Sequence, residues 1–301
     1  MQGLRNLLLA VQFFTRIPVT GRLAAWVGYS PAMLRASAAH FPGVGWLVGA
    51  LLCTLVAAIA WALPGVAGGA GVASAPGAAG SGVAPWVAAW AVALGGVWIT
   101  GGFHEDGLAD LADGLGGSFD RQRALEIMKD SRIGAYGAMA LVLALGGRVV
   151  LWAALFGLMG LHAALPLLWL AQVASRTWPL FIIRTLAHVG DAAGSKSKPL
   201  ADQISLGALS VGLAWLVAGV GVAAGWRVWH EGNVASAGAL AAHFPVLALP
   251  LLASALAAAW MRRLLRRRLQ GFTGDGLGAT QQVAELAFVL GALLAWRWVA
   301  A

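Results

Sequence analysis

The sequence contains no aspartate, glutamate, lysine or arginine between residues 36 and 104. Soluble domains carry about 25% charged residues, whereas the whole of this chain is 11% charged and 60% hydrophobic. A bilayer crossing requires roughly 20 apolar residues, and the uncharged stretch is long enough for two. These features predict an all-α, polytopic helical membrane protein, in which residues 1–301 form a single integral membrane domain.

Further apolar segments of sufficient length follow, and we expect about seven transmembrane helices. The predicted spans are 38–63, 83–103, 134–158, 162–185, 205–228, 241–260 and 282–299. A neutral loop is expected at 64–82, and a polar loop containing Lys196 and Lys198 at 187–202. An N-terminal interfacial helix is expected at 4–16, ending before Pro18 because proline does not continue a helix.

Basic residues are concentrated in the segments on one side of the predicted membrane. If the N-terminus is cytoplasmic, 16 of the 20 lysines and arginines fall on the cytoplasmic side. This bias accounts for the net charge of +8, so we expect the lipid bilayer, and no nucleic acid, as a partner. The acidic segment 101–132 and the glycine-rich segment 271–281 then share the cytoplasmic face. The sequence leaves open whether the protein forms a homo-oligomer.

Acidic side chains are scarce and clustered. The chain has 12 of them, and the stretch from 105 to 130 contains Glu105, Asp106, Asp110, Asp113, Asp120, Glu126 and Asp130. The spacing of Asp106, Asp110 and Asp113 places them on one face of a helix, where their charges repel. A hard cation would relieve this repulsion, and we expect Mg²⁺ holding a phosphorylated substrate. These three and Glu105 are the predicted metal ligands; the alternative is a solvated acidic turn between two membrane helices.

A second candidate site lies in the glycine-rich segment 271–281. Its glycines free the backbone to approach a ligand. The last span is expected to begin just after it, which makes a helix N-terminus available to a phosphate. Asp275 is predicted to be a fourth metal carboxylate or the general base for a hydroxyl nucleophile. The alternative is a glycine-rich turn capped by Asp275.

Three basic residues are candidates for binding a diphosphate. Lys129 and Arg132 lie between the acidic cluster and a Gly-x-x-Gly sequence, and Arg176 lies inside the fourth span, where a charge usually faces a polar cavity. Anchoring at the membrane interface is the alternative for Arg176, and Arg148 and His104 receive no role. The sequence has no Ser/His/Asp set and no P-loop lysine pattern. The residues therefore favour metal-assisted phosphoryl or nucleotidyl transfer at a membrane face.

Five separated motifs carry a family resemblance. They are Phe14-Thr15-Arg16-Ile17-Pro18, Phe41-Pro42-Gly43-Val44-Gly45, residues 102–114, residues 129–137 and Gly271-Phe272-Thr273-Gly274-Asp275. Together, and in this order, they resemble the cobalamin synthase family of adenosylcobinamide-GDP ribazoletransferases over nearly the full length of the chain.

The resemblance implies the last joining step of cobalamin biosynthesis. In that step adenosylcobinamide-GDP and α-ribazole, or its 5′-phosphate, give adenosylcobalamin, or its phosphate, and GMP. The resemblance also implies Mg²⁺ dependence and a multi-pass location in the bacterial inner membrane with a cytoplasmic active face. Our hypothesis for this reaction gives the acidic cluster the metal, makes Asp275 the base or an additional ligand, and lets the three basic residues hold the diphosphate.

Two other functions fit parts of the sequence. A CDP-alcohol phosphotransferase also has an acidic helix motif, but this chain reads Asp106-Gly107-x-Ala109-Asp110 where that family has Asp-Gly-x-x-Ala-Arg. A cation transporter would carry its acids near the middle of the membrane, whereas these acids are predicted at its cytoplasmic edge. Both remain alternatives to the transferase.

Overall fold

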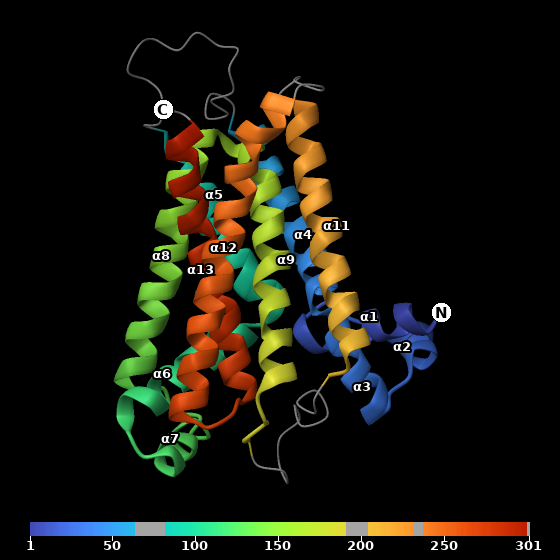
Figure 1. Cartoon of the computed structure of the whole chain (residues 1–301), viewed down its shortest axis with the longest axis vertical. Helices are drawn as coiled ribbons and strands as arrows, with labels where there is room; N and C mark the ends of the chain where they lie inside the picture. The colour runs from blue at the N-terminus through green and yellow to red at the C-terminus, as the bar shows by residue number, and fades with distance from the viewer. Residues whose placement is uncertain (64–81, 191–203, 231–236, 300–301) are drawn as a thin grey trace.

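The computed structural model describes residues 1–63, 82–190, 204–230 and 237–299, and Figure 1 shows them as a helical bundle. The expected loops at 64–82 and 187–202 lie mostly outside the described residues, as do Lys196 and Lys198. Within these ranges the regular structure is helical, apart from one isolated β-bridge between His188 and Phe272. The predicted all-α class is therefore confirmed, whereas a single domain over the whole chain stays a prediction.

Long helices run along the bundle axis (Figure 1). They are α4 (Phe41–Ala62), α5 (Ala84–Thr100), α8 (Ala135–Met159), α9 (Leu161–Thr185), α11 (Leu206–His230), α12 (Ala237–Arg268) and α13 (Gly274–Val299). Five helical segments of the described chain are long and apolar enough to cross a membrane singly, and α5 with the following helix forms a bent pair that passes the same test. A polytopic membrane protein is thus supported, and the count of seven spans stays a prediction.

Helix α9 lies inside the bundle and is not one of the five apolar segments. It has the required length, with 25 residues. However, it carries the buried polar side chains of Gln172, Ser175 and Arg176, which lower its hydropathy. Neighbouring helices enclose these groups, and Gly49 of α4 allows α9 to approach so closely that a Cβ atom there would lie 3.1 Å from Trp169 Cα. The polar part of α9 therefore faces protein.

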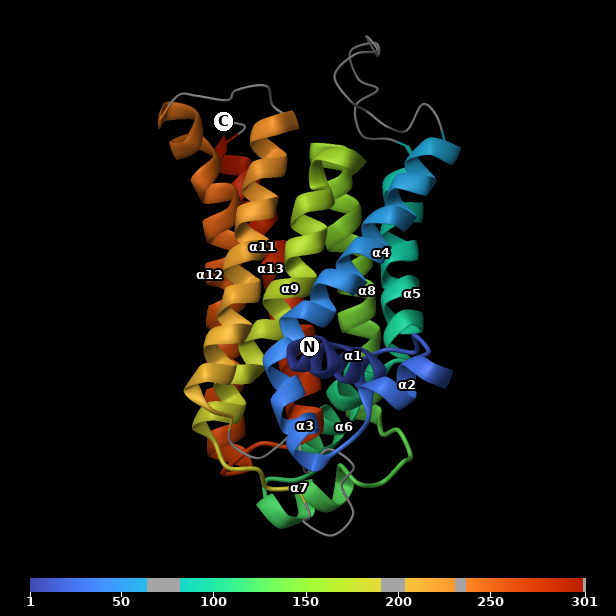
Figure 2. The ribbon, with the colours of Figure 1, turned by 90° about the vertical axis from the view of Figure 1, so that its right-hand side faces the viewer.

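Shorter helices gather at one end of the bundle (Figure 2). They are α1 (Gln2–Phe14), α2 (Gly21–Val27), α3 (Pro31–Ser37), α6 (Phe103–Gly117) and α7 (Arg121–Ile127). The N-terminal helix expected at 4–16 is thus present as α1, which runs across the bundle (Figure 2). Its location at a membrane interface stays a prediction.

The turn between α5 and α6 sets the direction of the acidic segment. Gly101 and Gly102 have φ angles of 69° and 73°, a left-handed conformation that glycine adopts without the steric cost of a Cβ atom. The two helices consequently meet at 91°. A side chain at Gly101 would also collide with the guanidinium of Arg16. Helix α6 therefore crosses the end of the bundle instead of continuing α5.

The acidic segment and the basic end of α12 are joined at this same end. Arg268 donates from Nη2 to the backbone oxygens of Leu115 at 3.0 Å and Ser118 at 2.7 Å. Arg121 donates from Nε to the oxygen of Leu269 at 2.7 Å. The two segments therefore lie at one end of the bundle, and the assignment of that end to the cytoplasmic side stays a prediction.

The last helix begins earlier than the sequence predicts. We expect its span to start at 282, yet α13 starts at Gly274 and contains most of the glycine-rich segment. Thr273 precedes the helix, and its Oγ1 accepts the N–H of Gly276 at 3.1 Å, which is the bond that a threonine N-cap makes. Asp275 therefore lies in the first turn of a helix and not in a loop.

Candidate active site

Two aspartates of α6 face a large cavity, which we call the acidic cleft. The cleft has a volume of about 760 Å³, and Asp106, Asp110, Arg16 and Ser131 are among its lining residues. Asp106 is exposed, and Asp110 is half-buried. The prediction that these acids share a helix is confirmed by α6, and the cleft gives them access to a ligand.

Helices α6 and α13 touch at a glycine, and this contact brings a third carboxylate, that of Asp275, close to Asp106 and Asp110. A Cβ atom on Gly107 would lie 2.8 Å from Asp275 Cα, so only glycine permits the approach. Asp275 then lies near enough to Asp106 and Asp110 for their charges to interact. Asp106, Asp110 and Asp275, which are far apart in the sequence, thus form one acidic group.

The electrostatics of this group follow from its crowding. Helix α6 runs across the bundle end, outside the five apolar segments. Burial, together with the negative charges of Asp275, Asp106 and Asp113, raises the pKa of the Asp110 carboxyl to about 7. Like charges that converge in this way are stabilised by a bound cation.

The donor set suits Mg²⁺ in its chemistry. Among the described residues, no group of three or more His, Cys, Asp or Glu side chains is arranged as a ready metal cage. Mg²⁺, however, is commonly bound through one or two carboxylates, with substrate phosphates and waters completing its shell. Asp106 and Asp110, with Asp275 beside them, provide such carboxylates. A metal in the cleft stays a prediction.

The other two predicted ligands already have partners inside the protein. Asp113 is buried and accepts the backbone N–H of Gly134 at 2.7 Å and that of Gly137 at 2.8 Å. It therefore fixes the first turn of α8 against α6, and side chains at either glycine would collide with its carboxylate. Glu105 takes part in the ion pair described next. Their ligation of a metal stays a prediction.

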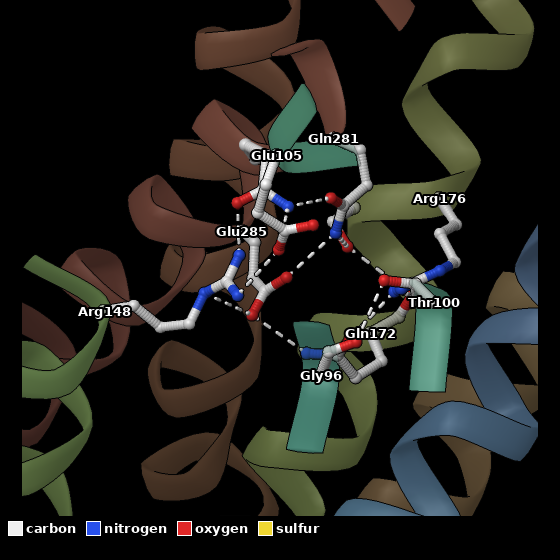
Figure 3. A network of polar contacts seen from close by, with 10 residues as sticks. Gly96, Thr100, Glu105, Arg148, Gln172, Arg176, Gln281 and Glu285 are labelled. Carbon is white, nitrogen blue, oxygen red and sulfur yellow. Dashed lines mark hydrogen bonds and ion pairs between the residues drawn. The ribbon is translucent and has the colours of Figure 1, made fainter. Parts of the chain in front are cut away.

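A buried ion-pair network lies behind the acidic cleft (Figure 3). Arg148 of α8 is only 3% exposed. Its Nη1 lies 3.2 Å from Glu105 Oε1 of α6, and its Nε lies 3.5 Å from Glu285 Oε1 of α13. Gln282 donates from Nε2 to Glu105 at 3.0 Å and accepts a bond from Arg148. The network therefore ties α6, α8 and α13 together.

The second half of this network reaches α9. Glu285 accepts Nε2 of Gln172 at 3.0 Å and Nε2 of Gln281 at 2.8 Å. Gln172 in turn accepts Nη1 of Arg176 at 2.8 Å. Two arginines and two glutamates thus compensate one another in a buried environment, where an unpaired charge would be costly.

An apolar cavity lies beside the network, and we call it the phenylalanine pocket. It is small, about 50 Å³, and its walls include Phe13, Phe14, Phe41, Phe103 and Phe272. His104, Arg176 and Gln281 also line it. The pocket and the acidic cleft share the side chains of Phe13 and Phe103, so the two cavities are neighbours.

The three predicted diphosphate ligands do not form one group. Lys129 and Arg132 are exposed and lie between α7 and α8. Arg132 forms an ion pair of 2.6 Å with Asp130, and its hydrogen bonds lower the pKa of Asp130 to about 2. Their neighbour Ser131 lines the acidic cleft. Arg176, by contrast, is 6% exposed inside α9. Diphosphate binding by these residues stays a prediction.

Sequence reasoning missed the amides and Glu285 of the network. Gln172, Gln281, Gln282 and Glu285 are buried polar side chains on two long helices. A usable signal was present, because polar residues within membrane helices usually face the bundle interior and mark functional positions. Arg148 belongs to this network and His104 lies beside it, although the sequence assigned neither residue a role.

Comparison with known proteins gives matches over nearly the whole chain. The model of the cobalamin-5-phosphate synthase family matches residues 6–293. The chain is 53% identical over 290 residues to the adenosylcobinamide-GDP ribazoletransferase of Albidiferax ferrireducens, covering 96% of this chain and 98% of the relative. The ribazoletransferase of Polaromonas naphthalenivorans is 50% identical over 306 residues, covering 97% and 98%. That of Vibrio cholerae is 36% identical over 283 residues, covering 94% and 91%.

No solved structure matches the chain. The family match and the relatives extend over nearly the whole sequence, and the family match includes both the acidic segment 101–132 and the glycine-rich segment 271–281. The chain therefore belongs to the cobalamin-5-phosphate synthase family.

Proposed function

We propose that this protein is the membrane transferase that joins adenosylcobinamide-GDP to α-ribazole, or to its 5′-phosphate, with release of GMP. The names of its relatives support the reaction class. The acidic cleft supports the chemistry, because carboxylates gathered at a bundle end suit a reaction on a diphosphate that requires a divalent cation. The single observation that carries the proposal is the meeting of Asp106, Asp110 and Asp275 across the contact between α6 and α13.

The reaction is a substitution at phosphorus. A ribose hydroxyl of α-ribazole forms a new O–P bond to the phosphorus attached to cobinamide, and the bond from this phosphorus to the oxygen of the GMP leaving group breaks. We assign the hydroxyl proton to the carboxylate of Asp275, which acts as general base. Asp106 and Asp110 would hold Mg²⁺. When bound, Mg²⁺ supplies positive charge beside the diphosphate.

The remaining residues position these groups. Glu105 and Asp113 hold α6 from behind, through Arg148 and through the first turn of α8. Lys129 and Arg132, which flank a residue of the cleft wall, are proposed to bind the diphosphate as it enters. The buried location of Arg176 favours a different contact with substrate, which the next subsection derives.

The location follows from the same reasoning. We propose that the protein resides in the bacterial inner membrane with the acidic cleft on the cytoplasmic side, because basic residues at this end would favour that orientation. The lipid bilayer is then its permanent partner. A homo-oligomer is compatible with this proposal.

The proposal is tested with purified protein in detergent, supplied with adenosylcobinamide-GDP, α-ribazole and Mg²⁺. We expect GMP and a cobalamin product, and no product after chelation of divalent metal until Mg²⁺ is restored. Asp110→Asn should lower turnover by about a hundredfold, because a lost metal contact removes several kcal/mol of transition-state stabilisation. Wild-type protein that forms no product would refute the function; full turnover by Asp110→Asn would refute only the metal site.

A further inference from the structure

The phenylalanine pocket has the composition of a site for a flat aromatic ring. Phe13, Phe14, Phe41, Phe103 and Phe272 all contribute to its walls. Several of these rings meet edge to face, for example Phe14 and Phe41 with centroids 4.4 Å apart. Aromatic side chains provide stacking and edge contacts for a planar base, and such contacts do not require a particular charge.

One residue that lines the pocket has a polar atom without a partner. Arg176 lines the pocket and is 6% exposed. Its Nη1 bonds to Gln172, whereas its Nε is buried without a hydrogen-bond partner. A buried donor of this kind is costly unless something accepts its hydrogen. A ligand with one acceptor atom on an otherwise apolar ring would satisfy it.

The pocket is placed beside the reacting groups. Gly274 lines the pocket, and the next residue, Asp275, belongs to the acidic group of the neighbouring cleft. Phe13 and Phe103 stand in the walls of both cavities. A ligand whose ring enters the pocket would therefore extend any group attached to that ring toward the cleft.

We propose that the phenylalanine pocket binds the aromatic base of the acceptor nucleoside, with Arg176 donating from Nε to the free ring nitrogen of that base. This inference rests on the proposed function, in which the acceptor is α-ribazole, a ribonucleoside of a substituted benzimidazole. An N-glycosylated benzimidazole has one unsubstituted ring nitrogen, and this atom is an acceptor. The attached ribose then carries its hydroxyl to Asp275, while the phenylalanine rings turn aside to admit the base.

The other parts of the substrates fit the pocket less well. The cavity of about 50 Å³ admits a benzimidazole only when its walls move, and the much larger corrin macrocycle would require a far greater displacement. Guanine has several donors and acceptors along its edges, and a mostly apolar wall would leave many of them without partners. The large acidic cleft, with a volume of about 760 Å³, is the place for the diphosphate and the groups on either side of it.

Filling the pocket tests the proposal. Leu277 of α13 lines it, so Leu277→Trp should occupy the space needed by the base. Leu290→Trp is the matched control, because Leu290 is on the same helix and 49% exposed. We expect Leu277→Trp to raise both the KM and the directly measured Kd for α-ribazole by about tenfold or more, as loss of base stacking would. The KM for adenosylcobinamide-GDP should stay within about twofold of wild type.

A milder variant guards against misfolding of the first. Phe103→Leu removes one ring of the wall at a residue that is 38% exposed, and it should weaken α-ribazole binding by about five- to tenfold. Binding of free 5,6-dimethylbenzimidazole, followed by its fluorescence, should weaken in parallel in both variants. Leu290→Trp should bind both compounds as wild type does.

The outcomes separate this inference from the function. If wild-type protein forms cobalamin and both pocket variants keep wild-type affinity for α-ribazole, the pocket assignment is wrong and the function stands. If the variants weaken binding of GMP instead, the pocket holds guanine and the assignment is again wrong. If wild-type protein neither forms product nor binds α-ribazole, both the function and the pocket assignment are overturned.

Discussion

The acidic cleft and the phenylalanine pocket are neighbours with opposite designs. The cleft is large and open, and its carboxylates repel one another in the absence of a counter-charge. The pocket is small and aromatic, and it has a single buried donor without a partner. The difference indicates that the two cavities suit ligand groups of different chemistry. The cleft has more acidic than basic side chains, with Glu105, Asp106 and Asp110 against Arg16, whereas the pocket lacks a flat apolar group with one acceptor atom.

Removing the proposed base should produce the largest difference between the two cavities. Asp275→Asn keeps the size of the side chain and the contact with Gly107, and it should lower kcat by about 10²- to 10⁴-fold, the range for loss of general-base catalysis. Binding of α-ribazole in the pocket should change by less than about twofold. Steady-state kinetics and direct binding measure the two effects.

The control for this variant is an acid outside the cleft. Asp120 caps α7 by accepting the N–H of Arg123 at 2.8 Å, and asparagine is an equally good N-cap. Asp120→Asn should therefore retain wild-type kcat. Equal losses in the two variants would mean that the acids act through the overall charge of this end and not through a base at Asp275.

Breaking the buried network should disturb both cavities together. Arg148→Met leaves Glu105 and Glu285 buried without their cation, and removal of one partner of such a pair costs about 3–5 kcal/mol. Glu105 lines the cleft and Arg176 lines the pocket, so α-ribazole affinity and kcat should both fall. Chemical unfolding in detergent gives the stability change.

An exposed ion pair provides the comparison for Arg148. Arg123 and Glu126 lie 3.1 Å apart with side chains 66% and 49% exposed. Surface pairs of this kind contribute about 0–1 kcal/mol, so Arg123→Met should leave stability, kcat and α-ribazole affinity nearly unchanged. A stability loss for Arg148→Met as small as that of the control would contradict a structural role for the network.

Separating α6 from α13 should affect the cleft more than the pocket. Gly107→Ala places a methyl group about 2.8 Å from Asp275 Cα, and such overpacking costs about 1–3 kcal/mol. We expect a clear loss of kcat with little change in α-ribazole affinity. Gly146→Ala is the control, because a Cβ atom on Gly146 of α8 meets nothing within 4 Å. Thermal unfolding and kinetics compare the pair.

The exposed Asp130–Arg132 pair should have the smallest effect on either cavity. Its hydrogen bonds hold the pKa of Asp130 at about 2, below the usual value of 3.8. A depressed carboxyl pKa stabilises the fold above about pH 4, and this contribution disappears as the pH falls through 2. Asp130→Asn should therefore lower the unfolding midpoint slightly at pH 7 and not at pH 2. A difference that grows on acidification would show that the pair does not control this pKa.

Local sequence patterns predicted the features that depend on neighbouring residues. The spacing of Asp106 and Asp110 predicted their common helix. The apolar segments predicted the long helices with ends correct to a few residues, except that α12 continues to Arg268 beyond the predicted end at 260 and that α13 begins earlier than predicted. The start of α13 was predicted too late because the glycine-rich segment was interpreted as a loop. Thr273 caps that helix, and α6 packs along its first turns, so tertiary contacts outweigh the low helix propensity of glycine.

Features built from distant segments were not predictable from spacing. Arg148 forms ion pairs with Glu105 of α6 and with Glu285 of α13. No local sequence pattern pairs these residues. The spacing of Asp113 places it with the acidic cluster, yet its carboxylate accepts hydrogen bonds from the backbone N–H groups of Gly134 and Gly137. The phenylalanine pocket likewise combines side chains from five helices and the segment before α13 only after folding.

The right-angled turn at Gly101 and Gly102 has a mechanical consequence. Helix α6 has 15 residues and is about 22 Å long at the usual helical rise. Only Gly101 and Gly102 connect it to α5. A change in the tilt of α5 would swing α6 as a lever and move its carboxylates relative to Asp275. In a membrane whose thickness differs from the length of the bundle, altered helix tilt would therefore change the spacing of these acids to the extent that the contacts of α6 with α8 and α13 permit.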